Sequence, residues 1–179
     1  FYESLNGNEN PDSGDFKFGQ TITTGYLPNE NEHFFNEKQS LIDWLREFSD
    51  NKDEVYIRGF LGKMLFSGEE TFKMANVLSG GEKVRCMISR MMLKGGNLLM
   101  LDEPTNHLDL ESIQAFNNAL INFPGTVIFT CHDHHFTQTV ANRIVELTPN
   151  GCLDKLMTFD EYITSSKVKE QKQAMLQLA

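Results

Sequence analysis

The stretch NLLMLDEPTNHLD, residues 97–109, places two acids directly after an apolar run. The run 98–101 has no polar residue, which is typical of a strand buried on both faces of a parallel sheet. Helical spacing near 109–122 and a second apolar strand at 126–130 follow, and this order predicts an α/β fold with a parallel sheet. Ligands of such sheets bind at the carboxyl ends of the strands, so the acids Asp102–Glu103 are predicted to lie at a ligand-binding edge.

The composition fits one globular domain and excludes several broad classes. The 179 residues are 40% hydrophobic and carry a formal net charge of -9, so the chain has material for a core and is not a cationic coat for nucleic acid. Cys86, Cys131 and Cys152 lie far apart without C-x-x-C spacing, which indicates reduced thiols and a cytoplasmic location. No apolar run approaches the roughly 18 residues that a membrane-spanning helix needs, so we expect no transmembrane domain.

Helical spacing of apolar residues dominates the region from about residue 37 to residue 93. Apolar residues recur at three- and four-residue intervals over 37–48 and 77–93, and a further helix is expected at 53–65. The helix over 77–93 opens with Ser-Gly-Gly, and its methionines are expected to pack in the core rather than to bind a metal. These segments together predict a helical subdomain over about 37–93.

Shorter elements are expected towards both ends of the chain. FYESL at 1–5 is typical of the end of a helix, and FKFGQTITTGYL at 16–27 predicts a hairpin of two short strands. After a helix near 133–141, RIVELTPNGCLDKL at 143–156 predicts a closing pair of strands. The tail from residue 165 is polar and helix-prone, and we expect it to be frayed or to begin a linker.

The two acids at 102 and 103 indicate chemistry on a phosphate. Asp102 is placed to hold Mg²⁺, because a hard cation prefers oxygen ligands. Glu103, one residue further on, is placed to polarise a water molecule that attacks a phosphoryl group. The alternative for two acids alone is that they cap the following helix, but the whole motif LMLDEPTNHLD is far more specific.

LSGGE at 78–82 puts a hydroxyl group and two glycines just before a helix. Unhindered backbone N–H groups at a helix N-terminus form an anion site, so Ser79, Gly80 and Gly81 are expected to hold a phosphate. The alternative is an ordinary serine-capped helix. The strand with two acids downstream favours the phosphate site.

TCHDHHF at 130–136 follows the second buried strand. Its cysteine and three histidines are too crowded for structural zinc, which usually takes a distant second pair of ligands. His132, at the strand end, is instead placed to donate a hydrogen bond to a terminal phosphate. His134 and His135 are expected on the surface, at the start of the next helix.

LSGGE, LLMLDEPTNHLD and FTCHDHHF, in this order, resemble the signature, Walker B with D-loop, and switch-histidine segments of an ATP-binding cassette (ABC) ATPase. LSGGEKVR, DEPTNHLDLES and FLGKMLFSGEETFK resemble the ABC-F subfamily, whose members are soluble, carry two cassettes in one chain and act on ribosomes. The resemblance covers nearly the whole chain. It implies a P-loop NTPase-like ABC nucleotide-binding domain over 1–166, with a mostly parallel sheet, an inserted helical subdomain and an antiparallel β hairpin, and a polar tail or linker start at 167–179.

The resemblance also implies ATP and Mg²⁺ as cofactors and a role for each motif residue. On the nucleotide of this cassette, Asp102 would bind Mg²⁺, Glu103 would be the catalytic base and His132 the γ-phosphate switch. Asp109 would be the D-loop residue that links two sites. The signature would complete the ATP site of the opposite cassette with Ser79, Gly80, Gly81 and Glu82.

Two departures from the family pattern matter. The phosphate loop G-x-x-x-x-G-K-[ST], Walker A, is absent, because the pair Gly62-Lys63 is followed by Met64 and has Ile57 where the first glycine should be. In the family that loop lies just before the helix that FYESL resembles, so we expect a fragment that has lost the loop and is inactive alone. At GYLPNEN, Asn29 stands where the family usually has a glutamine that touches Mg²⁺ and the attacking water.

The resulting prediction is most of one cassette, the second rather than the first, of an ABC-F ATPase that hydrolyses MgATP. The partners implied by the resemblance are the other cassette of the same chain and the ribosome, with no transmembrane domain. Two alternatives stay open: the ATP-binding subunit of an ABC transporter, and a non-catalytic regulatory cassette, which Asn29 suggests.

Overall fold

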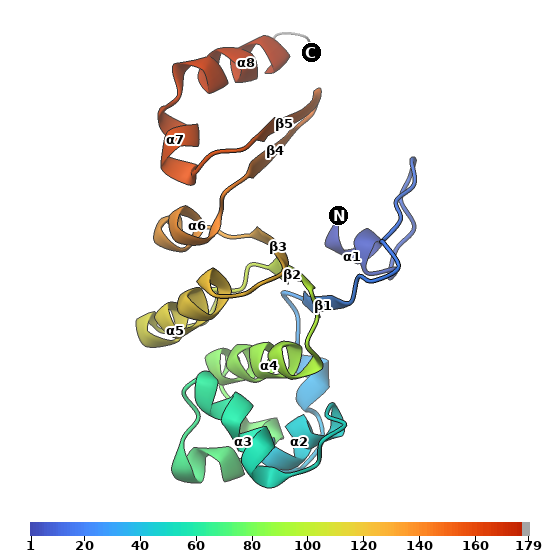
Figure 1. The fold of residues 1–179 in the computed structure, drawn as a ribbon, viewed down its shortest axis with the longest axis vertical. Helices are drawn as coiled ribbons and strands as arrows, with labels where there is room; N and C mark the ends of the chain where they lie inside the picture. The colour runs from blue at the N-terminus through green and yellow to red at the C-terminus, as the bar shows by residue number, and fades with distance from the viewer. Residues whose placement is uncertain (177–179) are drawn as a thin grey trace. The chain divides into compact units, whose positions relative to one another are not determined.

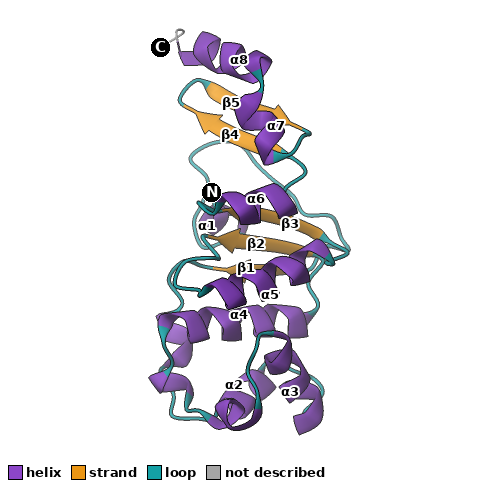
Figure 2. Cartoon of the chain, turned by 90° about the vertical axis from the view of Figure 1, so that its left-hand side faces the viewer, coloured by secondary structure: helices purple, strands orange, loops and turns teal. Residues whose placement is uncertain are grey.

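The computed structural model describes residues 1–176, and the chain divides into two compact units. The first unit comprises residues 1–131, and the second begins at His132. Figure 1 shows the order of the elements along the chain, and Figure 2 shows the helices and strands within each unit.

A parallel three-stranded sheet organises the first unit. Its strands, in spatial order, are β1 (Thr24–Leu27), β2 (Leu98–Asp102) and β3 (Thr126–Thr130). The central strand β2 is buried along its apolar run and pairs with a neighbour on each side. The predicted α/β class and the buried strand at 98–101 are therefore confirmed, and the carboxyl ends of the three strands meet at one edge.

Two longer helices flank the strands in sequence. α4 (Gly80–Lys94) precedes β2, and α5 (Leu110–Ile121) connects β2 to β3. Met87 and Met91 of α4 are buried, so they pack in the core as expected. α4 ends at Gly95, whose φ of 63° is a left-handed conformation that glycine adopts readily.

The chain between β1 and α4 is helical. Its core is organised by Trp44, whose indole ring stacks on Phe35 with ring centroids 4.8 Å apart and whose N–H donates to the Phe34 carbonyl at 2.8 Å. The helices expected at 37–48 and 53–65 are confirmed. The elements of this region are η1 (Glu32–Phe35), α2 (Leu41–Glu47), α3 (Glu54–Lys63), η2 (Gly68–Phe72) and η3 (Ala75–Val77).

The hairpin predicted at 16–27 is wrong, because among the described residues this segment contains the single strand β1. The backbone just before β1 takes its hydrogen bonds from Asn97, which directly precedes β2. The Asn97 side chain accepts from the Thr23 N–H at 2.9 Å and donates to the Thr21 carbonyl at 2.9 Å. These bonds replace those that a second strand would have supplied. The helix expected at 1–5 is present as α1 (Tyr2–Leu5).

The second unit contains the predicted closing hairpin. After α6 (His134–Val140), strands β4 (Ile144–Thr148) and β5 (Gly151–Lys155) pair antiparallel. Thr148 is opposite Gly151, so two residues form the turn. The helix near 133–141 and the pair of strands are confirmed.

Two helices complete this unit. α7 (Phe159–Thr164) was not predicted, and α8 (Ser166–Leu176) is a helix in the tail that was expected to be helix-prone and to fray or begin a linker. Glu146 of β4 holds both of them, since it accepts from the Tyr162 hydroxyl at 2.6 Å and forms an ion pair with Lys172. The boundary near residue 166 and the tail at 167–179 stay predictions, and residues 177–179 lie outside the described part of the chain.

Candidate functional site

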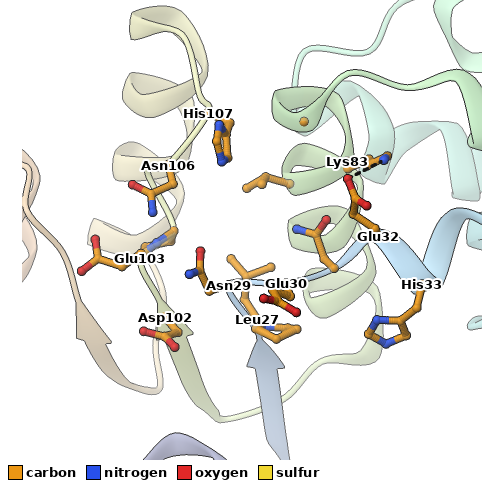
Figure 3. A pocket seen from close by; sticks show the side chains of 15 residues that line it. Leu27, Asn29, Glu30, Glu32, His33, Lys83, Asp102, Glu103, Asn106 and His107 are labelled. Atoms are coloured by element: carbon orange, nitrogen blue, oxygen red, sulfur yellow. Dashed lines mark ion pairs between the residues drawn. The ribbon is translucent and has the colours of Figure 1, made fainter.

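A cavity of about 720 Å³ opens at the carboxyl edge of the sheet in the first unit (Figure 3). Its walls come from the segment after β1, the first turns of α4, and the end of β2 with the loop that follows it. The predicted site residues that line it are Asn29, Gly80, Asp102 and Glu103. Residues from three separate segments thus line one cavity at the edge where α/β proteins bind ligands.

Asp102 is held by its neighbour across the sheet. The Thr130 hydroxyl donates to Oδ1 of Asp102 at 2.8 Å, and the two residues are opposite each other in the β2–β3 register. Among the residues that the structure describes, Oδ2 of Asp102 has no hydrogen-bond partner. The carboxylate is therefore fixed through one oxygen while the other stays available.

This arrangement fits Mg²⁺. Within residues 1–176, no group of three or more His, Cys, Asp or Glu side chains is placed to hold a metal. A single carboxylate suits Mg²⁺ at a phosphate site, because the ion keeps several waters and takes further oxygens from the substrate phosphates. Asp102 is the residue that would hold it.

Glu103 lies at the turn that ends β2. Its backbone φ is 48°, a left-handed value that is uncommon outside glycine. Its N–H donates to the carbonyl of Thr130 at 3.1 Å, which keeps the turn attached to the end of β3. Two residues on, the Thr105 hydroxyl lies 3.2 Å from Sγ of Cys131. The loop with the acids thus contacts the last residue of β3 and the residue that follows it.

Tyr2 of α1 is a buried residue whose phenol senses the charges of the two acids. It is 7% exposed. Burial raises the pKa of Tyr2 to about 12; the Thr130 hydroxyl opposes that shift, and the charges of Asp102 and Glu103 add to it. The phenol therefore stays neutral beside the two carboxylates.

The signature segment forms a complete helix cap. The Ser79 hydroxyl accepts from the Glu82 N–H at 3.3 Å, and the Glu82 carboxylate accepts from the Ser79 N–H at 2.9 Å and from Lys73 at 2.7 Å. Burial alone would raise the pKa of the Glu82 carboxyl, but the hydrogen bonds from Lys73 and Ser79 outweigh it and leave that pKa lowered. Ser79 and Glu82 are thus joined in a capping box, while their predicted phosphate role stays a prediction.

The glycines of the signature allow another loop to approach. A Cβ added to Gly81 would lie 2.5 Å from the carbonyl oxygen of His107, and one on Gly80 would lie 3.4 Å from the His107 side chain. His107 itself has a φ of 65°. The first turn of α4 is therefore packed directly against the loop that follows the two acids.

The two remaining predicted site residues, Asp109 and His132, do not line the cavity and lie near the starts of two helices. Asp109 is the N-cap of α5, where its carboxylate accepts from the Ser112 N–H at 2.8 Å. Hydrogen bonding with the backbone and side chain of Ser112 lowers the pKa of the Asp109 carboxyl. His132 opens the second unit, just before Asp133, the N-cap of α6. Their predicted roles in a nucleotide site stay predictions.

Sequence reasoning missed Thr130 as the neighbour of Asp102. Thr130 was within a quoted motif, but a side chain in a strand is assigned to a partner only through the register. The pairing of Asp102 with Thr130 depends on where β3 starts relative to β2. No local signal in the sequence states that offset.

Comparison with known proteins decides the family. A protein-family model described as "ABC transporter" matches residues 1–106, more than half of the chain. The chain belongs to this family. The resemblance to an ABC ATPase domain of the ABC-F type, stated from the motifs, is confirmed.

Two curated relatives illustrate the range of the match. The chain is 55% identical over 172 residues to the uncharacterized ABC transporter ATP-binding protein YkpA of Bacillus subtilis, covering 95% of this chain and 32% of the relative. It is 32% identical over 153 residues to the energy-dependent translational throttle protein EttA of Escherichia coli K12, covering 84% of this chain and 28% of the relative. The chain therefore spans about a third of the length of these relatives.

A solved structure supports the fold. An archaeal ribosome recycling factor in complex with a ribosomal stalk protein matches 97% of this chain and 40% of its own with a TM-score of 0.74 at 22% identity. This similarity confirms the ABC nucleotide-binding fold that the resemblance implied. Among residues 1–176, no helix is both long enough and apolar enough to cross a membrane.

Proposed function

We propose that this chain is most of one cassette of an ABC-F ATPase that binds and hydrolyses ATP with Mg²⁺. The observation that carries the proposal is the acid edge, the pair Asp102–Glu103 at the end of β2. Asp102 lines the cavity with one carboxylate oxygen fixed by Thr130, and Glu103 follows in a turn with positive φ. Oxygen ligands next to a candidate base are what phosphoryl transfer to water requires.

The residues of this cassette divide the work on its own nucleotide. Asp102 holds Mg²⁺, which when bound neutralises charge on the phosphate oxygens. Glu103 takes a proton from the attacking water, and His132 donates a hydrogen bond to the γ-phosphate. Asn29 lines the same cavity in the position where the family usually has glutamine, and we propose that it contacts the metal or the water from its shorter side chain.

The signature works on the nucleotide of a second cassette. Backbone N–H groups of the first turn of α4 point out of a helix N-terminus, where an anion is favoured. We propose that Ser79, Gly80, Gly81 and Glu82 form the signature that completes the ATP site of the opposite cassette, with Asp109 linking the two sites. The partner is the other cassette of a longer chain, in line with relatives about three times the length of the match.

The 179 residues alone are proposed to be inactive. The sequence contains no G-x-x-x-x-G-K-[ST] motif, and without it the amide cradle and the lysine for the β- and γ-phosphates are missing. Hydrolysis is therefore proposed for the full-length protein that contains this segment.

The ribosome is the proposed site of action. The name of the Escherichia coli relative, a translational throttle protein, favours a role in translation, and we propose a cytoplasmic location with that role. The second candidate is an ATP-binding subunit of a transporter, which the name of the Bacillus subtilis relative favours. The two candidates share the chemistry at Glu103 and differ in the partner.

Two measurements on the full-length protein test the proposal. Glu103→Gln is expected to lower ATP turnover by about 100-fold or more, because it removes the base, whereas Glu47→Gln on the exposed end of α2 leaves turnover unchanged. The Glu103→Gln protein is then sedimented with ribosomes in the presence of ATP. Pelleting supports the ribosome, and no pelleting argues for the transporter. Unchanged turnover in Glu103→Gln would contradict the catalytic assignment.

A further inference from the structure

We propose that Thr130 is a positioning residue for the metal-binding carboxylate of Asp102. The inference rests on the proposed function, since it assigns the residue that orients the metal ligand. Thr130 ends β3, and Asp102 ends β2 directly opposite. The Thr130 hydroxyl donates to Oδ1 of Asp102 at 2.8 Å.

The hydrogen bond selects which oxygen of Asp102 is left for a ligand. A carboxylate on a strand end rotates about two side-chain torsions, and its terminal torsion is only loosely restricted. A donor on Oδ1 removes that freedom and leaves Oδ2 without a partner among the described residues. Partners of this kind, which orient a metal ligand without touching the metal, strongly influence metal affinity.

The same residue also sets the position of Glu103. The Thr130 carbonyl accepts from the Glu103 N–H at 3.1 Å, at the point where the backbone turns with a φ of 48°. Thr130 thus contacts one acid through its side chain and the next through its backbone. A change in the side chain alone leaves the second contact intact, so the two functions can be separated by substitution.

A purely structural reading of Thr130 makes a different prediction. A β-branched residue suits a strand, and valine would fill that need equally well. Thr130 is exposed, so its hydrogen bond contributes little to folding. The hydroxyl should therefore matter for metal binding more than for stability.

Thr126 provides a matched control at the other end of β3. It is also an exposed threonine, and its partner in the register is Leu98, which has no carboxylate. Thr126→Val therefore repeats the same chemical change on the same strand without touching the acids. Thr130→Ser keeps the hydroxyl and should preserve metal binding.

The test measures Mn²⁺, as a spectroscopic substitute for Mg²⁺, bound to the full-length protein with a non-hydrolysable ATP analogue. Bound and free Mn²⁺ are distinguished by electron paramagnetic resonance. Thr130→Val is expected to raise the Kd for Mn²⁺ by about 10-fold, whereas Thr130→Ser and Thr126→Val stay close to the unsubstituted protein. Thermal unfolding is recorded for each variant, and Thr130→Ala replaces Thr130→Val if the latter does not fold.

Each outcome decides a separate point. An unchanged Kd in Thr130→Val, or an equal loss in Thr130→Ser, overturns the positioning role. Asp102→Asn separates this failure from that of the proposed function: if it leaves the Kd for Mn²⁺ unchanged, Asp102 is not the metal ligand and both proposals fall. A second readout is the Mg²⁺ concentration for half-maximal hydrolysis, which a merely structural role of Thr130 would not move.

Discussion

The acid edge and the signature cap lie in the same unit but use their polar groups differently. In the signature cap, defined here as Ser79–Glu82, the side chains of Ser79 and Glu82 bond to the helix that they begin, and Lys73 adds an ion pair. At the acid edge, among the residues that the structure describes, one side-chain hydrogen bond fixes Oδ1 of Asp102 and none is made by Oδ2. The polar side chains of the signature cap thus bond within the chain, whereas Asp102 keeps one carboxylate oxygen without a partner among the described residues.

Among the substitutions that test this difference, the largest loss of stability is expected at Gly81 in the signature cap. Gly81→Ala is expected to lower the free energy of unfolding by about 1–3 kcal/mol, because the new methyl group meets the backbone carbonyl of His107 and not a movable side chain. Urea unfolding measures the change.

Gly59→Ala, inside α3, is the matched control. A Cβ at Gly59 meets nothing within 4 Å, so this variant should be as stable as the unsubstituted chain or more stable by about 0.5–1 kcal/mol. An equal loss in both variants would contradict the packing of Gly81 on His107.

Removing the Ser79 hydroxyl should lower the free energy of unfolding less than the change at Gly81 does. Ser79→Ala is expected to cost about 1 kcal/mol of stability, since the Glu82 N–H loses its acceptor. Ser13→Ala, an exposed serine before β1, is the control and should cost nothing measurable by urea unfolding. A neutral Ser79→Ala would mean that the signature cap does not support the helix.

The carboxylate of Glu82 predicts a pH dependence. Its pKa is lowered in the folded state, so its contribution is present above the ordinary glutamate pKa of about 4.3 and is lost as the pH falls through the lower folded value. Urea midpoints measured from pH 6 down to pH 3 should fall less steeply for Glu82→Gln. Parallel pH curves for the two proteins would show that the hydrogen bonds from Lys73 and Ser79 do not stabilise the charge.

The smallest effect on stability is expected at the acid edge. Thr130→Val should change the free energy of unfolding by less than about 0.5 kcal/mol, because the hydroxyl is exposed and valine suits a strand. The same urea titration as for Ser79→Ala allows a direct comparison. A loss as large as that of Ser79→Ala would mean that the two regions use their polar groups in the same way.

The elements and the motif residues could be predicted from the sequence, because they depend on local periodicity. The buried run at 98–101 and the Ser-Gly-Gly start of α4 carry such signals. The hairpin at 16–27 could not be judged locally, since Asn97, far along the chain, satisfies that backbone. α7, which was not predicted, does begin with a local signal, the Thr158–Glu161 capping box.

The site was predictable in its residue types and less so in its geometry. Asp102 and Glu103 were assigned to the carboxyl edge of a sheet from a single motif, and both line the cavity there. The contact from Thr130 depends on strand register, and the approach of His107 to Gly81 depends on packing between separate loops. Neither leaves a periodic signal in the sequence.

The central claim is that the acid edge forms only part of a nucleotide site, because the sequence has no phosphate-loop motif. A calorimetric titration of MgATP into the 179-residue chain tests it most directly. No detectable binding is expected, because one carboxylate and a helix N-terminus cannot replace the lysine and amides of a phosphate loop. Binding in the micromolar range that Asp102→Asn weakens would contradict this, since it would mean that the described residues already form a complete nucleotide site.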